Sequence, residues 1–139
     1  MKVFVYGTLR KDSWNHRVMW TGDSEFLCYA KTKEPKIMID VGIPYLYDFS
    51  TAENPVRESN YHVIGEIYEV NNIAPLDQLE SNGYHYERKI DNFIKLKELG
   101  ANEYEDTAEE LEAWVYYSCN EKIPDNYDFI EDFVSKRGL

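Results

Sequence analysis

Residues 3–10 are Val-Phe-Val-Tyr-Gly-Thr-Leu-Arg, a run of β-branched and aromatic residues that stops abruptly at Gly7. The segment from Lys2 to Tyr6 predicts a first strand, and the glycine predicts a turn directly after it. After such a turn, successive backbone N–H groups can point into one concavity, which suits a carboxylate or the developing negative oxygen of a reaction intermediate. The alternative interpretation is an ordinary exit from a strand into a loop.

The remainder of the chain also favours strands over long helices. The clearest strand is predicted at 61–70, where both faces mix apolar and polar residues. Short helices are expected at 15–20, and from Pro75 to about Ser81 after the capping residues Asn71 and Asn72. The other expected elements are strands at 26–32, 37–40, 45–49, 88–97 and 111–119, a polar loop at 50–60, an acidic loop between the last two strands, and a terminal helix at 124–136. This pattern predicts one α+β domain over 1–139, with a small barrel-like, antiparallel or mixed sheet and a few short helices.

A second segment, Leu76-Asp77-Gln78-Leu79-Glu80, carries a possible proton-transfer group. On a helix, Leu76, Leu79 and Glu80 share one face, so Glu80 would lie at the edge of an apolar stripe that faces the core. Partial burial raises the pKa of a carboxyl group, and we expect repulsion from Asp77 to act in the same direction. Such a group suits acid–base work near neutral pH. Alternatively, Glu80 caps the stripe and pairs with Arg88.

Composition limits the classes of protein. The chain has 139 residues, of which 43% are hydrophobic and 15% aromatic, which suits one packed core and argues against disorder. Acids outnumber bases 26 to 15, and the net charge of −11 disfavours nucleic acid as a partner. No apolar run approaches the roughly 20 residues of a membrane span, nor does the start resemble a signal peptide. We therefore expect a soluble cytoplasmic protein with no membrane partner.

Charged residues and cysteines give weaker signals. Residues 103–132 hold 11 acids and one base, which favours a solvated surface over a site for cationic partners such as polyamines. Cys28 and Cys119 lie far apart and predict free thiols in a reducing compartment. His16, His62 and His85 lack metal-ligand spacing, so no metal site is expected.

Several short motifs occur together in a fixed order, and together they resemble the γ-glutamylcyclotransferase-like superfamily. The closest resemblance is to its AIG2-like branch, the γ-glutamylamine cyclotransferases, and it extends from residue 3 to about 118. The motifs are Val-Phe-Val-Tyr-Gly-Thr-Leu at 3–9, Asn-His-Arg-Val at 15–18, Glu-Pro at 34–35, Gly-Ile-Pro-Tyr-Leu at 42–46, Leu-Asp-x-x-Glu at 76–80 and Tyr-x-Arg at 86–88. One departure is Ser-Asn-Gly-Tyr at 81–84, which replaces the usual residues after the glutamate and leaves substrate preference open.

The resemblance implies a small fold around a β-barrel and the release of 5-oxoproline from a γ-glutamyl compound. By position, Glu80 matches the family's catalytic acid/base. Tyr6, Gly7, Thr8 and Leu9 match the loop that binds the γ-glutamyl portion, and Tyr86 matches a tyrosine of the pocket. The implied reaction needs no metal, nucleotide or flavin. The expected partner is a small-molecule γ-glutamyl substrate; the sequence does not fix the oligomeric state, for which a monomer is expected.

Two rival functions stay open. The same chemistry could act on γ-glutamyl amino acids instead of γ-glutamylamines, although a net charge of −11 makes the extra carboxylate of such substrates less favourable. The chain could also be a non-catalytic module that binds a small molecule and retains the pocket.

Overall fold

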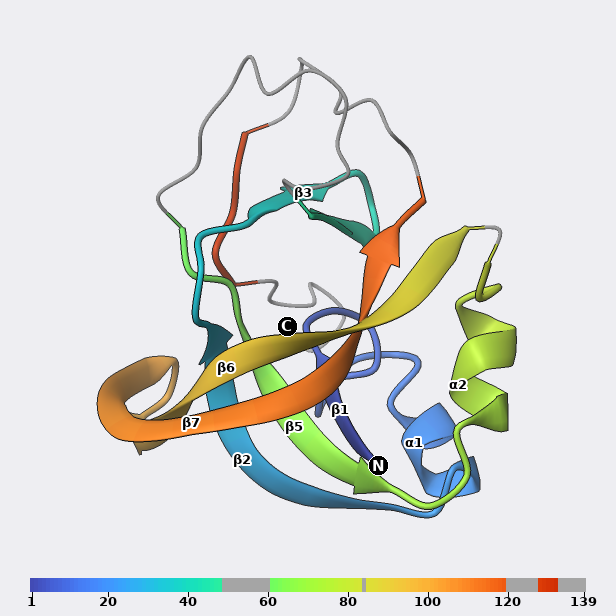
Figure 1. Ribbon diagram of the computed structural model, residues 1–139, viewed down its shortest axis with the longest axis horizontal. Coiled ribbons are helices and arrows are strands. Elements are labelled where there is room, and N and C mark those ends of the chain that lie inside the picture. Colours follow the sequence, from blue (N-terminus) through green and yellow to red (C-terminus); the bar gives the residue numbers. More distant parts are fainter. Residues whose placement is uncertain (49–60, 84, 120–127, 133–139) are drawn as a thin grey trace.

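A closed, five-stranded β-barrel forms the body of the molecule in the computed structural model, which describes residues 1–48, 61–83, 85–119 and 128–132 (Figure 1). The barrel order is β1-β5-β2-β6-β7. The strands are β1 (Lys2–Val5), β2 (Ser24–Thr32), β3 (Ile37–Asp40), β4 (Pro44–Tyr47), β5 (Ile64–Val70), β6 (Tyr86–Gly100) and β7 (Glu103–Ser118), and the helices are α1 (Arg17–Thr21) and α2 (Ala74–Leu79). The predicted α+β class and barrel-like sheet are confirmed.

One parallel contact closes a sheet that is otherwise antiparallel. β1 runs parallel to β7, with Val3 opposite Trp114 and Phe4 opposite Val115. Every other barrel pairing is antiparallel, so the sheet is mixed. Because β1 is buried between β5 and β7, the turn that follows it at Gly7 leaves from the middle of the barrel wall.

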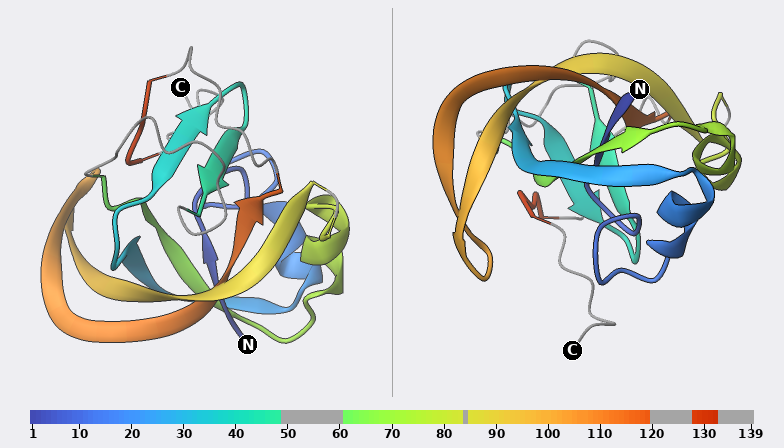
Figure 2. Two further views of the ribbon diagram at one scale, coloured as in Figure 1. Left: turned by 45° about the horizontal axis from the view of Figure 1, so that its top comes forward. Right: turned by 90° about the horizontal axis from the view of Figure 1, so that it is seen from below.

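A separate β3–β4 hairpin lies against one end of the barrel, and the two helices lie beside β1 and β5 (Figure 2). Both helices were predicted within one or two residues of their observed bounds. The side chain of Asn72 accepts the N–H of Ala74 at 3.2 Å and Pro75 stands in the first turn of α2, as the sequence indicated. No helix in the described part of the chain is both long and apolar enough to cross a membrane.

The prediction of an acidic loop between the last two strands is wrong. β6 and β7 instead form one long hairpin that pairs Gly100 with Glu103 and bends around the barrel. The acidic side chains of β7 are exposed, and half-buried Tyr104, Thr107 and Leu111 are interspersed among them. Lysines on neighbouring strands pair with several of them: Lys31 with Asp106, Lys33 with Glu110 and Lys95 with Glu109. The described part of the acidic segment is therefore a surface strand up to Glu112 and a buried barrel strand beyond it.

The expected terminal helix at 124–136 and the polar loop at 50–60 lie largely or wholly outside the described residues. Within 128–132 the chain is not helical: Phe129 forms an antiparallel bridge with Ile39 on β3, and Ile130 donates its N–H to the carbonyl of Met38 at 2.9 Å. This segment therefore extends the β3–β4 side of the molecule.

Candidate active site

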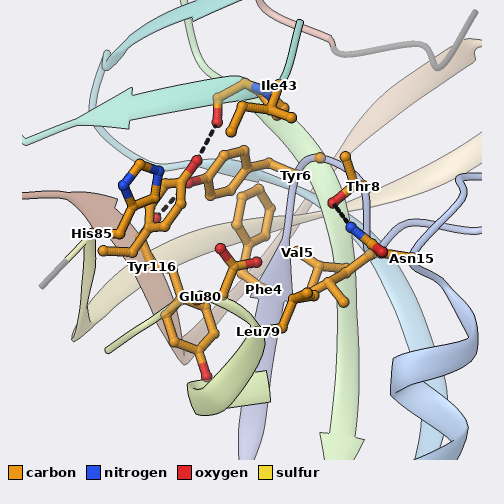
Figure 3. Close-up of a pocket in the computed structure, with 14 residues that line it drawn as sticks. Phe4, Val5, Tyr6, Thr8, Asn15, Ile43, Leu79, Glu80, His85 and Tyr116 are labelled. Carbon is orange, nitrogen blue, oxygen red and sulfur yellow. Dashed lines mark hydrogen bonds between the residues drawn. The ribbon is translucent and has the colours of Figure 1, made fainter. Parts of the chain in front are cut away.

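A cavity of about 270 Å³ opens at the end of β1, between the β3–β4 hairpin and the C-terminal end of α2 (Figure 3). The six residues singled out in the sequence all line it: Tyr6, Gly7, Thr8, Leu9, Glu80 and Tyr86. Phe4, Val5 and Tyr116 add barrel side chains, whereas Ile43 and Pro44 come from the hairpin. The structure thus brings together two segments that are separated by 70 residues of sequence.

Four hydrogen bonds from residues that follow it in the chain hold the turn after β1 in place. The N–H of Arg10 donates to the carbonyl of Gly7 at 3.0 Å and closes the turn. Asn15 donates its backbone N–H to the carbonyl of Thr8 and its side-chain amide to the Thr8 hydroxyl, both at 3.0 Å. His16 Nδ1 donates to the carbonyl of Leu9 at 2.8 Å. These contacts use the backbone carbonyls of Gly7, Thr8 and Leu9 as acceptors.

Three consecutive N–H groups, those of Gly7, Thr8 and Leu9, donate to no acceptor within the described ranges. Consecutive unpaired N–H groups at a cavity wall form a site for negative charge. The role predicted for this turn, binding a negative charge, stays a prediction that these groups are consistent with.

Gly7 is required by close packing with the hairpin. A Cβ atom at this position would lie 2.4 Å from Cγ of Pro44, well inside van der Waals contact. The glycine lets β4 approach the turn, and this contact shapes one wall of the cavity.

Glu80 directly follows α2 and extends its carboxyl group into the cavity, toward the rings of Phe4 and Tyr6 (Figure 3). Burial raises the pKa of Glu80 from 4.5 to about 7. Within the described residues, no side chain or backbone group donates a hydrogen bond to this carboxyl group. The group is therefore poised to gain or lose a proton near neutral pH.

Three tyrosine side chains surround Glu80, and each directs its hydroxyl elsewhere. Tyr6 donates to the backbone carbonyl of Tyr116 at 2.5 Å, Tyr86 to the carbonyl of Pro44 at 2.9 Å, and Tyr116 to the carboxylate of Asp77 at 2.6 Å. Burial, together with the nearby Glu80, raises the pKa of both Tyr6 and Tyr86. Their hydroxyls stay protonated and occupied, so these residues contribute ring surface to the cavity.

Two details of the predicted helix are wrong. Leu76 is fully buried, but Leu79 is 39% exposed and lines the cavity instead of the core, because α2 ends there. Asp77 does not raise the pKa of Glu80, for which burial is the cause. Its carboxylate is instead bound by the guanidinium of Arg88, which removes Arg88 as the partner considered for Glu80.

Sequence reasoning missed a buried carboxylate behind the turn. Glu66 on β5 is only 2% exposed and accepts three hydrogen bonds: from Nε of Arg10 at 3.1 Å, from the N–H of Lys11 at 3.0 Å and from the Tyr68 hydroxyl at 2.7 Å. Arg10 also pairs with Asp132. The available signal was a glutamate in the middle of an apolar strand. This cluster fastens the far end of the turn to the barrel.

Metal binding finds no support in the described part of the chain, where no three His, Cys, Asp or Glu side chains form a cluster that could hold an ion. His85 lies at the cavity, with its ring against those of Tyr45 and Tyr86. His62 directs Nδ1 to the carbonyl of Thr32 at 2.9 Å.

Together, the fold and the cavity define a small-barrel protein in which a carboxyl group of raised pKa shares a cavity with the turn at residues 6–9. Comparisons with known proteins assign the class more narrowly. Residues 3–132 match the family model described as gamma-glutamyl cyclotransferase, AIG2-like. The chain belongs to this family.

Named relatives support the same assignment. A protein of Methanocaldococcus jannaschii, described as a "putative gamma-glutamylcyclotransferase", is 35% identical over 83% of this chain and 82% of its own length. The gamma-glutamylaminecyclotransferase A of Danio rerio is 34% identical over 84% of this chain and 68% of its own. The crystal structure of an AIG2-like protein from Mus musculus superposes with a TM-score of 0.72 at 25% identity, covering 97% of this chain and 88% of that one. The family and the barrel fold predicted from the motifs are confirmed.

Proposed function

We propose that this protein is a γ-glutamylamine cyclotransferase, which converts a γ-glutamylamine into 5-oxoproline and a free amine. The observation that carries the proposal is the placement of Glu80, whose pKa is raised to about 7, in the same cavity as the N–H groups of Gly7, Thr8 and Leu9, which have no acceptor among the described residues. Family membership supports cyclotransferase chemistry, and the residues below supply its steps.

The reaction is an intramolecular acyl transfer. The α-amino nitrogen of the substrate attacks the γ-carbonyl carbon, which forms the ring C–N bond and a tetrahedral intermediate; the original amide C–N bond then breaks. Since nucleophile and electrophile are tethered, the enzyme gains by selecting the folded rotamer, an effect of up to several kcal/mol. The cavity of about 270 Å³ suits this selection because it is narrow and walled by rings.

One proton must move from the attacking nitrogen to the leaving nitrogen. An alkylamine with a conjugate-acid pKa near ~10.4 cannot depart as an anion and needs that proton as the bond breaks. We assign the transfer to Glu80: the carboxylate accepts the proton of the attacking amine and the resulting carboxylic acid donates it to the leaving amine. The two transfers cancel, so the enzyme ends in its starting state.

Negative charge develops on the carbonyl oxygen in the intermediate, and the substrate also carries an α-carboxylate. The N–H groups of Gly7, Thr8 and Leu9 can serve either anion. A donor at an oxyanion contributes roughly 3 kcal/mol in other acyl-transfer sites. The proposal requires that at least one of these N–H groups meets the oxyanion.

The cavity lining favours an amine over an amino acid as the leaving group. Among the described lining residues there is no lysine or arginine that could pair with the extra carboxylate of a γ-glutamyl amino acid. Two partly exposed apolar side chains, Ile43 and Leu79, line it from different elements and suit an alkyl stem. The relative from Danio rerio carries the name gamma-glutamylaminecyclotransferase, which points in the same direction.

The test is chromatographic detection of 5-oxoproline after incubation with γ-glutamyl-ε-lysine and with γ-glutamyl-alanine. We expect turnover of the lysine isopeptide, weaker turnover of the alanine compound, and loss of both in Glu80→Gln. The matched control is Glu112→Gln, an exposed carboxyl on β7, which should retain wild-type turnover. An active Glu80→Gln enzyme would rule out this mechanism. A preference for γ-glutamyl-alanine would favour the amino-acid alternative, and binding of 5-oxoproline without turnover would favour the non-catalytic module.

A further inference from the structure

Glu80 depends on its surroundings for its position. It follows a helix of only six residues, and a helix this short has little stability of its own. Within the described ranges its carboxyl group receives no hydrogen bond that would orient it. The direction in which Glu80 enters the cavity must therefore be set by whatever holds the end of α2 against the barrel.

Asp77 makes that connection with three hydrogen bonds to two strands. Its Oδ1 accepts from Nε of Arg88 at 3.0 Å and from the hydroxyl of Tyr116 at 2.6 Å, and its Oδ2 accepts from Nη2 of Arg88 at 3.2 Å. Arg88 belongs to β6 and Tyr116 to β7. The guanidinium also lies 4.5 Å above the ring of Trp114, which fixes it from a third side. Bidentate, charge-assisted bonds of this kind define a geometry as well as an energy.

The backbone beyond Glu80 closes on the same residues. The carbonyl of Asp77 accepts the N–H of Asn82 at 3.0 Å, and the side chain of Asn82 accepts the N–H of Arg88, also at 3.0 Å. Glu80 thus lies in the short stretch between Asp77 and Asn82, and both of these residues are hydrogen-bonded to Arg88. A shift of this pair would move Glu80 relative to the turn at residues 6–9.

We propose that Asp77 is the positioning residue of this site: its clamp on Arg88 and Tyr116 fixes the end of α2 and so aims the Glu80 carboxyl group at the turn at residues 6–9. The proposal rests on the proposed function for its catalytic consequence. Its structural claim, that Asp77 determines the surroundings of Glu80, stands apart from any activity.

Asp91 on β6 provides a matched control, because it is bound by Tyr117, the neighbour of Tyr116 on β7. Tyr117 donates its hydroxyl to Asp91, which pairs with the buried Lys36 at 3.2 Å. Asp91 therefore has the same chemistry as Asp77, a carboxylate held by one tyrosine and one cation, but it lies on β6 and does not contact α2. Asp77→Asn and Asp91→Asn remove comparable interactions, but only the interactions of Asp77 are coupled to Glu80.

Kinetics separate positioning from general stability. We expect Asp77→Asn to lower kcat at least tenfold with KM within twofold, and Asp91→Asn to keep kcat within twofold. Arg88→Gln should reproduce the loss, and the double variant Asp77→Asn/Arg88→Gln should be no worse than either single one, because both remove the same clamp. Equal losses in Asp77→Asn and Asp91→Asn, or additive losses in the double variant, would overturn the proposal.

A second readout does not need turnover. The carboxyl carbon of Glu80 can be titrated by NMR in the wild type and in Asp77→Asn. Among the described residues that line the cavity, the other titratable groups are Tyr6, His85, Tyr86 and Tyr116, and all four are present in both proteins. We expect a lower titration midpoint in the variant, because a displaced carboxyl group gains solvent. An unchanged midpoint refutes the positioning role. If the wild type releases no 5-oxoproline, the proposed function fails while this titration still decides the role of Asp77; should Asp77→Asn not fold, Arg88→Gln gives the same titration.

Discussion

Replacing Glu80 with glutamine should stabilise the folded protein, and the gain should grow with pH. The pKa of Glu80 rises from 4.5 to about 7 on folding. The folded state therefore binds the proton more tightly, and the contribution of this group to stability is fully present below pH ~4.5 and lost as the pH rises through about 7. Linkage gives a cost of about 1.4 kcal/mol at pH ~5.5 and about 3.4 kcal/mol at pH ~8.5. Glutamine does not ionise and carries no such cost.

The measurement is urea denaturation of wild type and Glu80→Gln at both pH values, with thermal melts as a second probe. The difference in unfolding free energy between the two proteins should increase by about 2 kcal/mol from the lower to the higher pH, or about 7 °C in Tm for a chain of this size. Any effect of the glutamine amide on the unfolding free energy that does not depend on pH cancels in that comparison. Glu112→Gln, an exposed control, should show no such increase. A constant difference for Glu80→Gln would mean that the carboxyl group is not desolvated, and the reasoning on its pKa would be wrong.

Three further predictions follow from the same geometry. The pH profile of kcat/KM should have an acidic limb near pH 7, because Glu80 must be ionised to accept a proton; a profile flat from pH ~5 to ~8 would exclude this. Gly7→Ala should lower kcat at least tenfold without unfolding the barrel, since its Cβ would lie 2.4 Å from Pro44; circular dichroism and turnover together check this. Glu66→Ala should cost about 3 kcal/mol in urea denaturation, because it leaves the buried Arg10 with fewer partners, and a loss under ~1 kcal/mol would contradict it.

Local sequence patterns predicted most of the barrel and the contents of the cavity. The strand at 37–40 was located correctly, and both helices were found from a capping asparagine, a proline and the spacing of apolar residues. Two groups of cavity residues were singled out from local patterns: residues 6–9 because a glycine ends a hydrophobic strand, and Glu80 because it follows a leucine pair at helical spacing. Each pattern is confined to a few neighbouring residues, whereas Tyr86 was singled out only through the family resemblance.

Features that depend on contacts between distant segments could not be predicted in this way. The acidic stretch of β7 was interpreted as a loop because it is dominated by charge and its half-buried residues, Tyr104, Thr107 and Leu111, are spaced by three and four instead of the two of a regular strand. The lysines that pair with its acids come from β2 and β6 or lie next to them. Repulsion from Asp77 was expected because the partner that neutralises it, Arg88, is placed by the fold of β6. Glu66 was missed for the same reason, since its three donors meet only in the closed barrel.

Burial of Glu80 affects both the stability of the fold and the proposed proton transfer, because it raises the pKa of the carboxyl group. Raising the pKa of the Glu80 carboxyl group from 4.5 to about 7 makes transfer of a proton to it from the attacking nitrogen more favourable by about 3.4 kcal/mol. This difference corresponds to a factor of about 300 in a step limited by that transfer. It equals the folding free energy that the buried carboxylate costs once it is ionised, above about pH 8. A tyrosine hydroxyl turned toward Glu80 would remove both effects, because a hydrogen bond to a charged group is worth about 1.5–3 kcal/mol. The acceptors that hold the hydroxyls of Tyr6, Tyr86 and Tyr116 are therefore as necessary to the proposed proton transfer as the carboxyl group itself.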